Sequence, residues 1–177
     1  MDAALPDSPA KGLRVRAAAA ADVAALLGLL RPFLEEQGRL EPTFRAVSAW
    51  EEGARTYVTA YLARPDAWVL LALHDERPAG FIFYGLSHEP LFEHSRVGHI
   101  ADLFVLPEFR RHGAGRRLAE MALGHLRQSG AQGVQLQVHV RNSEGERFWR
   151  RLGFEPFLWR MKLMMPSDGG PAPGGRP

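Results

Sequence analysis

Residues 99–117 constrain the fold of this chain more than any other stretch. Their first part, residues 100–106, is apolar apart from Asp102, which is typical of a strand inside a sheet. Pro107 ends that strand because it has no N–H to donate to a neighbour, and from Leu118 onward apolar residues return at helical spacing. The stretch therefore predicts a buried strand joined to a helix by a short connection.

The connection between this strand and this helix contains two glycines, Gly113 and Gly115. Glycine lets the backbone approach a ligand closely, and a helix N-terminus carries roughly half a positive charge that attracts anions. The spacing matches neither the phosphate loop that ends in Lys-Ser/Thr nor the three-glycine dinucleotide fingerprint. The glycines alone leave a tight turn and a pyrophosphate site open, and the nearby arginines favour the anion: Arg110, Arg111, Arg116 and Arg117.

The motif Arg110-x-x-Gly113-x-Gly115 resembles the Gln/Arg-x-x-Gly-x-Gly/Ala signature of the GNAT superfamily of N-acetyltransferases. Residues 105–110 are similar to the end of that family's fourth strand. Residues 142–154, an Asn before a helix that ends in Leu-Gly-Phe, resemble its second signature. The resemblance implies an α/β fold, in which helices flank a central mixed sheet whose fourth and fifth strands splay apart.

Hydrophobic periodicity predicts the elements along the chain. In chain order, they are a strand over 13–17, a helix over 22–36 that Gly38 ends, a helix over 47–62, strands over 68–73 and 79–86, a polar loop over 87–96, the strand and helix described above, a strand over 134–140, a helix over 143–152 and a closing strand over 157–163. Aromatic residues at helical spacing in the second helix belong either to the core, the more common case, or to a substrate pocket: Trp50, Tyr57 and Tyr61.

The chain has 177 residues, of which 46% are hydrophobic, and this is enough apolar material for one core. We therefore expect a single domain over residues 12–165. Residues 1–11 and the Pro/Gly-rich residues 166–177 contain too few apolar side chains to offset the entropy lost on ordering. We expect both ends to be loose.

The composition also restricts the compartment and the partners. The formal net charge of +2 implies no general attraction to nucleic acid or to an anionic membrane. The apolar run over residues 17–30 is interrupted by Asp22 and predicts an amphipathic helix, since a membrane span needs about 18 apolar residues. The chain has no cysteine, and no spacing typical of metal ligands is evident. We expect a cytoplasmic protein that binds no metal.

The resemblance implies acetyl-CoA as the acetyl donor, and it indicates which residues would hold it. The pantetheine arm would pair like an extra strand with Leu103, Phe104 and Val105, beside the gap between the fourth and fifth strands. Asn142 would contact the donor from the other side of the gap, and Trp149 would pack on it. The pyrophosphate would lie on the glycine loop, which comprises Arg110, Arg111, His112, Gly113, Ala114, Gly115 and Arg116.

The implied reaction is the direct attack of a primary amine on the thioester in a ternary complex. The amine must first lose a proton, because an ordinary ammonium has a pKa of ~10.4. The oxyanion needs an N–H donor, and the backbone N–H near Val105 is the expected source. Two proton carriers that are usual in the family are absent, because Ala101 replaces a Glu and Trp149, whose indole does not titrate, replaces a Tyr.

His99 on the fourth strand is the preferred candidate for the general base, and Asp102 on the same strand is a less favoured one. Strand alternation puts His99 on the same face as Ala101, and an ordinary histidine has a pKa of ~6.5; the alternative is a histidine that only caps the strand. Asp102 points to the opposite face unless a bulge intervenes, and a structural hydrogen bond is its more common role. His139 and Tyr84, on neighbouring strands, are weaker candidates.

The missing Glu and Tyr leave a second interpretation open, an acyl-CoA-binding sensor or pseudoenzyme without turnover. A third, nucleic-acid binding through the arginines, is less favoured because acidic residues balance those on the helix faces. Two kinds of acceptor remain open, a small-molecule amine and a peptide N-terminus or lysine, and so does the length of the acyl chain. Members of the family often pair through sheet edges or the last strand, so a homodimer is also an open expectation.

Overall fold

The computed structural model describes residues 12–91 and 93–165. The loose ends expected at residues 1–11 and 166–177 lie outside the described residues. The chain divides into two compact units, one up to Arg141 and one from Asn142 onward. Within the described residues, the first unit holds the sheet and the helices α1 to α3, and the second holds α4 (Ser143–Arg151).

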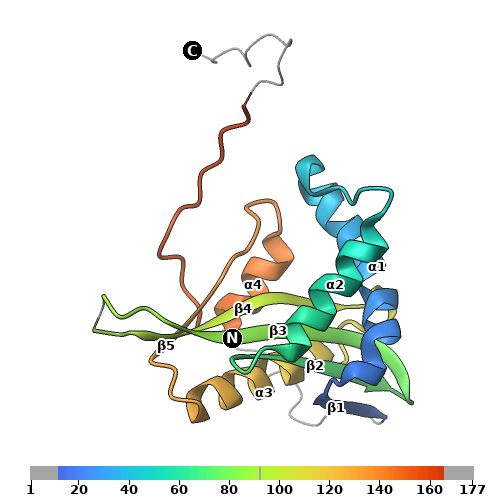
Figure 1. Ribbon diagram of the computed structural model, residues 1–177, viewed down its shortest axis with the longest axis horizontal. Helices are drawn as coiled ribbons and strands as arrows, with labels where there is room; N and C mark the ends of the chain where they lie inside the picture. Colours follow the sequence, from blue (N-terminus) through green and yellow to red (C-terminus); the bar gives the residue numbers. More distant parts are fainter. Residues whose placement is uncertain (1–11, 92, 166–177) are drawn as a thin grey trace, which may run out of the picture. The chain divides into compact units, whose positions relative to one another are not determined.

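The sheet of the first unit has the strand order β1-β2-β3-β4-β5 (Figure 1). Neighbouring strands are antiparallel except for β4 and β5, which run parallel, so the sheet is mixed as expected. Short turns connect the antiparallel strands β2 and β3, whereas α3 provides the crossover that a parallel pair needs. The strands are β1 (Leu13–Ala17), β2 (Ala67–His74), β3 (Arg77–His88), β4 (Arg96–Val105) and β5 (Gly133–Leu136).

Helices cover both faces of this sheet, as Figure 1 shows. On one face lie α1 (Val23–Leu40) and α2 (Trp50–Ala63), which supply apolar side chains to the core. On the other lies α3 (Ala114–Gln128), whose Leu126 packs against β4 at Gly98. Among the described residues, a short 3-10 turn precedes each of α1, α2 and α3, namely η1 (Ala20–Asp22), η2 (Pro42–Phe44) and η3 (Pro107–Phe109).

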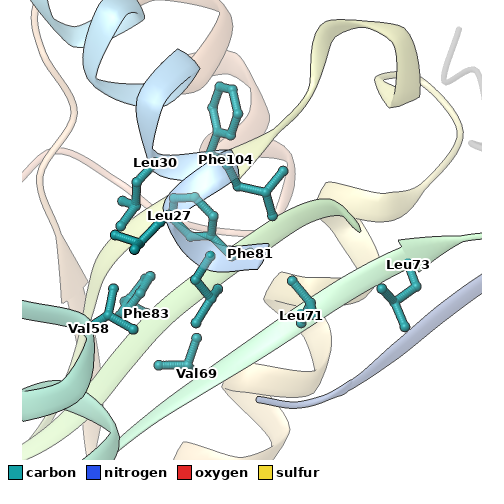
Figure 2. Packing of buried hydrophobic residues seen from close by; sticks show 11 residues of the cluster. Leu27, Leu30, Val58, Val69, Leu71, Leu73, Phe81, Phe83 and Phe104 are labelled. Atoms are coloured by element: carbon teal, nitrogen blue, oxygen red, sulfur yellow. The ribbon is translucent and has the colours of Figure 1, made fainter. Parts of the chain in front are cut away.

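The main core lies between the sheet and the helices α1 and α2 (Figure 2). Every second residue of β2 and β3 faces it, because successive side chains of a strand point to opposite faces of the sheet. Burial of these apolar side chains is the dominant favourable contribution to folding, at roughly 25 cal/mol per Å² of apolar area. The cluster contains Leu26, Leu27, Leu29, Leu30, Val58, Val69, Leu71, Leu73, Phe81, Phe83 and Phe104.

The start of α1 is tied to the first strand by an ion pair. The Arg16 guanidinium donates to both carboxylate oxygens of Asp22 at 2.7 Å, and the Ala19 N–H donates to the same carboxylate at 2.8 Å. These hydrogen bonds lower the pKa of Asp22 to about 2. The pair therefore fixes the turn between β1 and α1.

The structure corrects three of the sequence-based expectations in particular. The prediction that Gly38 ends the first helix is wrong, because α1 runs to Leu40. Gly38 is instead a point of close approach, where a Cβ would lie 3.2 Å from the Arg45 side chain. The strand expected over 134–140 ends at Leu136. The closing strand expected over 157–163 is not formed, and its apolar side chains are exposed.

A strand requires hydrogen bonds to a neighbouring strand. The alternation of apolar and polar residues along the sequence does not show whether such a neighbour is present. This explains why the strand predicted over 134–140 ends early and why the one predicted over 157–163 is not formed. In the part of the chain that the structure describes, no helix has the length and hydropathy needed to cross a membrane.

Candidate acyl-CoA and amine site

The glycine loop has the backbone conformation of an anion-binding turn. Gly113 precedes α3 with φ of +82°, a left-handed conformation that glycine adopts without strain, and Arg111 has φ of +64°. The first main-chain hydrogen bond of the helix runs from the Arg117 N–H to the Gly113 carbonyl at 2.9 Å. The N–H groups of Ala114 and Gly115 therefore precede the helical ladder and point toward the loop. Such converging N–H groups bind phosphate oxygens.

The arginines of the loop differ in their contacts. Arg116 donates to Glu120, one helical turn onward, at 2.6 Å. Arg110 turns away from the loop and donates to Glu36 and to the Val105 carbonyl. The Arg111 side chain is exposed and makes no ion pair with a described residue. Of the three, Arg111 is the one whose charge is available to a phosphate.

The two edges of β4 differ beyond Ile100. Pairing with β5 ends where Ile100 lies opposite Leu136, while pairing with β3 continues to Val105 opposite Gly80. The splayed fourth and fifth strands implied by the resemblance are therefore present. From Ala101 to Val105, β4 has an edge that pairs with no described strand.

Alternation decides which groups face this open edge. The Leu106 N–H donates to the Ala79 carbonyl at 2.9 Å, on the β3 side. In an antiparallel pair, successive residues direct their N–H and C=O groups to opposite sides, so those of Leu103 and Val105 face the open edge. The Phe104 carbonyl faces β3, since a Cβ on Gly80 would lie 2.5 Å from its oxygen. The expected pairing through Phe104 is therefore wrong, and its ring lies in the core.

A β-bulge at Ala101 changes the faces of β4. Asp102 lies opposite Phe83 and Ile100 lies opposite Tyr84, so Ala101 is an extra residue on β4. The bulge reverses the alternation that a regular strand would have. Asp102 consequently shares a face with His99, and the expectation of opposite faces for a regular strand does not hold here.

Asp102 lies beneath α2 and forms a hydrogen bond with it. The Tyr57 hydroxyl donates to Asp102 Oδ2 at 3.0 Å. Burial raises the pKa of Asp102 above its ordinary value, and the Tyr57 hydrogen bond partly offsets that rise. No other described residue bonds this carboxylate, and no described side-chain oxygen is both buried and unsatisfied, so Oδ1 reaches solvent. Asp102 can therefore accept a proton through Oδ1.

Aromatic rings surround this carboxylate. The Tyr57 and Tyr61 rings lie 5.6 Å apart, and both contact Phe83, at 5.5 and 5.0 Å between centroids. Burial raises the pKa of Tyr61 to about 12, and burial together with the Asp102 charge raises that of Tyr57. Tyr57 remains 40% exposed, so it is not simple core as the spacing suggested. Its exposure and its hydrogen bond to Asp102 on a distant strand distinguish it from a core residue, and the sequence carries no signal of that partner.

His99 lies in a chain of hydrogen bonds. Its Nε2 lies 2.6 Å from Ser87 Oγ, and its Nδ1 lies 3.3 Å from Gln135 Nε2. The Ser87 hydroxyl in turn donates to the Val97 carbonyl at 3.3 Å. An amide N–H can only donate, so Nδ1 accepts and Nε2 carries the proton of a neutral ring. Both ring nitrogens are occupied by protein groups, which is typical of a structural histidine.

The second unit holds Asn142 and Trp149, the last two residues that were predicted to contact the donor. Asn142 caps α4, because its side-chain oxygen accepts the Gly145 N–H at 2.8 Å. Trp149 is 8% exposed and packs edge-on against Phe148 and Phe154, with centroids 4.9 and 5.3 Å away. Within this unit both side chains therefore have structural roles, and their predicted contact with a donor stays a prediction.

Comparison with known proteins identifies relatives of this chain. The sequence profile of the Acetyltransferase (GNAT) family matches residues 30–154. An uncharacterised N-acetyltransferase of Archaeoglobus fulgidus is 34% identical over 95 residues, which cover 54% of this chain and 65% of that protein. Mycothiol acetyltransferase of Nocardiopsis dassonvillei is 30% identical over 159 residues, which cover 81% of this chain and 47% of that protein. The chain thus spans less than two thirds of either relative.

Solved structures share the fold at lower identity. A tetramutant of the BH1408 protein from Bacillus halodurans has a TM-score of 0.77 and 20% identity, covering 86% of this chain and 99% of that one. Aminoglycoside N-acetyltransferase AAC(6')-Iy, in complex with CoA, has a TM-score of 0.70 and 17% identity, covering 86% and 94%. Because the family profile matches more than half of the sequence, from the middle of α1 to Phe154, this chain belongs to the Acetyltransferase (GNAT) family.

Proposed function

We propose that this protein transfers the acetyl group of acetyl-CoA to a primary amine, by direct attack of the amine in a ternary complex. The observation that carries the proposal is a half-buried carboxylate with one open oxygen, Asp102 Oδ1, on the strand whose edge opens beside it. Family membership and the glycine loop support acetyl-CoA as the donor.

The donor fits the groups that the chain offers. The Gly113 turn, the first N–H groups of α3 and the exposed Arg111 would bind the pyrophosphate. The N–H and C=O groups of Leu103 and Val105 would pair with the amide-bearing arm, as one strand pairs with another. Acetyl-CoA supplies the activated thioester. The Val105 N–H would stabilise the negative charge that develops on the carbonyl oxygen.

Asp102 is the general base in this proposal. Oδ1 accepts a proton from the ammonium, directly or through one water, and leaves the nitrogen lone pair free to attack. The C–N bond forms, the C–S bond breaks, and the leaving thiolate takes up the second proton that the nitrogen loses as it becomes the amide. Burial suits Asp102 to this role because a raised pKa makes a carboxylate a stronger base. Tyr57 holds the carboxylate in place through Oδ2.

The amine acceptor follows from the surroundings of Asp102. Aromatic faces beside a carboxylate favour a cation, because the ring quadrupole attracts positive charge. A small-molecule amine and a peptide N-terminus or lysine both satisfy this chemistry. The structural relative AAC(6')-Iy is an aminoglycoside N-acetyltransferase and another relative is a mycothiol acetyltransferase, so aminosugars belong among the first acceptors to test.

A panel of amines, aminoglycosides and peptides incubated with acetyl-CoA tests this function. We expect release of free thiol with one class of amine, and mass spectrometry should show one added acetyl group per amine. The second candidate, an acyl-CoA sensor without turnover, is favoured by Ala101, which offers no carboxylate at the position where many relatives carry Glu. Tight binding of acetyl-CoA without thiol release on any amine would support the sensor. Sedimentation of the same sample tests the predicted homodimer.

A further inference from the structure

Arg110, the first residue of the glycine-loop motif, makes two hydrogen bonds and a ring contact with the protein. Its Nε donates to the Val105 carbonyl at 2.9 Å, and its Nη2 donates to the Glu36 carboxylate at 2.6 Å. The guanidinium carbon also lies 5.7 Å from the centre of the Phe104 ring. The three contacts involve the Nε atom, the Nη2 atom and one face of the same planar guanidinium.

The electrostatics of this contact argue against a phosphate role for Arg110. The side chains of Arg110 and Glu36 are 31% and 34% exposed, so neither is fully hydrated. A phosphate that took Arg110 Nη2 from Glu36 would break a charge-assisted hydrogen bond of 2.6 Å and leave the Glu36 carboxylate unpaired beside it. Arg111, the next residue, is exposed and has no such competitor.

The Val105 carbonyl is the acceptor that Arg110 occupies, and it belongs to the open edge of β4. Its partner is therefore a side chain rather than another strand. A ligand that pairs with this edge like a strand can use the Leu103 C=O and the Val105 N–H. The next acceptor along the edge, the Val105 C=O, is already bonded to Arg110. A ligand shifted by two residues along β4 would need the Val105 C=O as its hydrogen-bond acceptor.

We propose that Arg110, held by Glu36 of α1, is a positioning residue that blocks the end of the open edge and thereby fixes the register in which the thioester arm pairs with β4. This inference rests on the proposed function, since it concerns how the donor is held. It replaces the expectation that Arg110 binds pyrophosphate. The acyl carbon can meet the Val105 N–H and Asp102 together in only one register, so the positioning acts on both affinity and rate.

The test compares two donors that differ in their phosphates. Acetyl-CoA carries the pyrophosphate, and acetyl-pantetheine has the same thioester arm without phosphates. Calorimetry gives the affinity of each for the wild type and for Arg110→Met, which keeps the side-chain length and removes the donors. We expect both affinities to fall by the same factor, about tenfold, since the Val105 peptide, whose N–H pairs with the arm, loses the hydrogen bond that holds it in place. We also expect kcat to fall for both donors.

Two further variants sharpen the comparison. Glu36→Gln should reproduce the loss for both donors to a smaller extent, because it weakens the hold on Arg110. Arg111→Asn, in which Asn tolerates the left-handed backbone, is the matched control and should weaken acetyl-CoA alone. If Arg110→Met weakens acetyl-CoA but not acetyl-pantetheine, or if Glu36→Gln tightens acetyl-CoA, Arg110 is a phosphate ligand and the inference is overturned.

A folding defect and a failure of the proposed function give different results. If Arg110→Met does not fold, Arg110→Lys keeps the charge but cannot reach both partners with one planar group. Equal loss for both donors then supports positioning, and retained affinity for acetyl-CoA contradicts it. A wild type that binds neither donor refutes the proposed function, whereas a wild type that binds both, with a loss confined to acetyl-CoA in the Arg110 variant, refutes only this inference.

Discussion

The two halves of β4 share one neighbour and differ in the other. Residues 97–100 pair with β3 on one side and β5 on the other, whereas residues 102–105 pair with β3 alone. In the first half, His99 has both ring nitrogens bound by protein groups. In the second half, Asp102 has one open oxygen. The half that is closed on both sides has its polar groups satisfied, and the half with an open edge keeps groups for a ligand.

The bulge at Ala101 separates these two halves. A bulge leaves one residue unpaired and increases the local twist of the strand, which moves its far edge away from a parallel neighbour. It also brings Asp102 onto the face that α2 covers, where Tyr57 meets it. One extra residue thus explains both the open edge and the placement of the proposed base.

The largest expected effect is that of Val105→Pro, which removes the N–H that faces the open edge. We expect kcat to fall by about 10²- to 10³-fold, since this is the usual cost of one lost oxyanion donor. The matched control is Leu106→Pro, which removes an N–H that bonds Ala79 on the β3 side. It should lower the free energy of unfolding by about 1–3 kcal/mol and spare the chemical step. Equal kcat values for the two variants would contradict the assignment of the two edges.

Asp102→Asn should lower kcat/KM by about 10²-fold or more, because an amide cannot accept the proton. Acetyl-CoA affinity should not change. Because burial raises the pKa of Asp102, the folded state holds this proton more tightly than the unfolded chain, so the ionised carboxylate lowers stability above that pKa. Thermal unfolding at neutral pH should therefore show Asp102→Asn to be at least as stable as the wild type. Retained turnover would remove Asp102 from the mechanism.

Tyr57→Phe should lower turnover at neutral pH by about three- to tenfold, the value of one hydrogen bond. The Tyr57 hydrogen bond lowers the pKa of Asp102, so its loss raises that pKa further. The rate falls where Asp102 is protonated, and the acid limb of the kcat/KM profile should therefore move to higher pH. A limb that stays in place, or moves to lower pH, would show that another group controls it.

The smallest expected effect on rate is that of His99→Asn, since both ring nitrogens serve the sheet. We expect kcat to change by no more than about twofold and the free energy of unfolding to fall by about 1–2 kcal/mol. A large loss of rate, together with loss of the acid limb of the pH profile, would show that His99 is the general base. The catalytic half of β4 would then be residues 97–100, which pair with both β3 and β5. The pH profile and a denaturant titration of the same sample distinguish the two results.

Much of the site could be predicted because its signals are local. The glycines after an apolar strand predict a tight turn and a helix start, and Gly113 forms such a turn, with φ of +82°, at the head of α3. The resemblance marks Asn142 before the last helix but not its role as a cap, which the structure adds. By contrast, the Tyr57–Asp102 pair joins residues 45 positions apart, and the Arg110–Glu36 pair joins residues 74 positions apart. Neither pair follows from spacing along the chain.

The sequence by itself determined the alternation of the strands, the glycine loop and the family, because periodicity and backbone freedom belong to neighbouring residues. Only the tertiary structure decided which backbone edge stays open, which face Asp102 occupies and where the Arg110 guanidinium binds. The physical reason is that hydrogen bonds and ion pairs need a partner at about 3 Å, and the distance between groups far apart in the chain is set by packing.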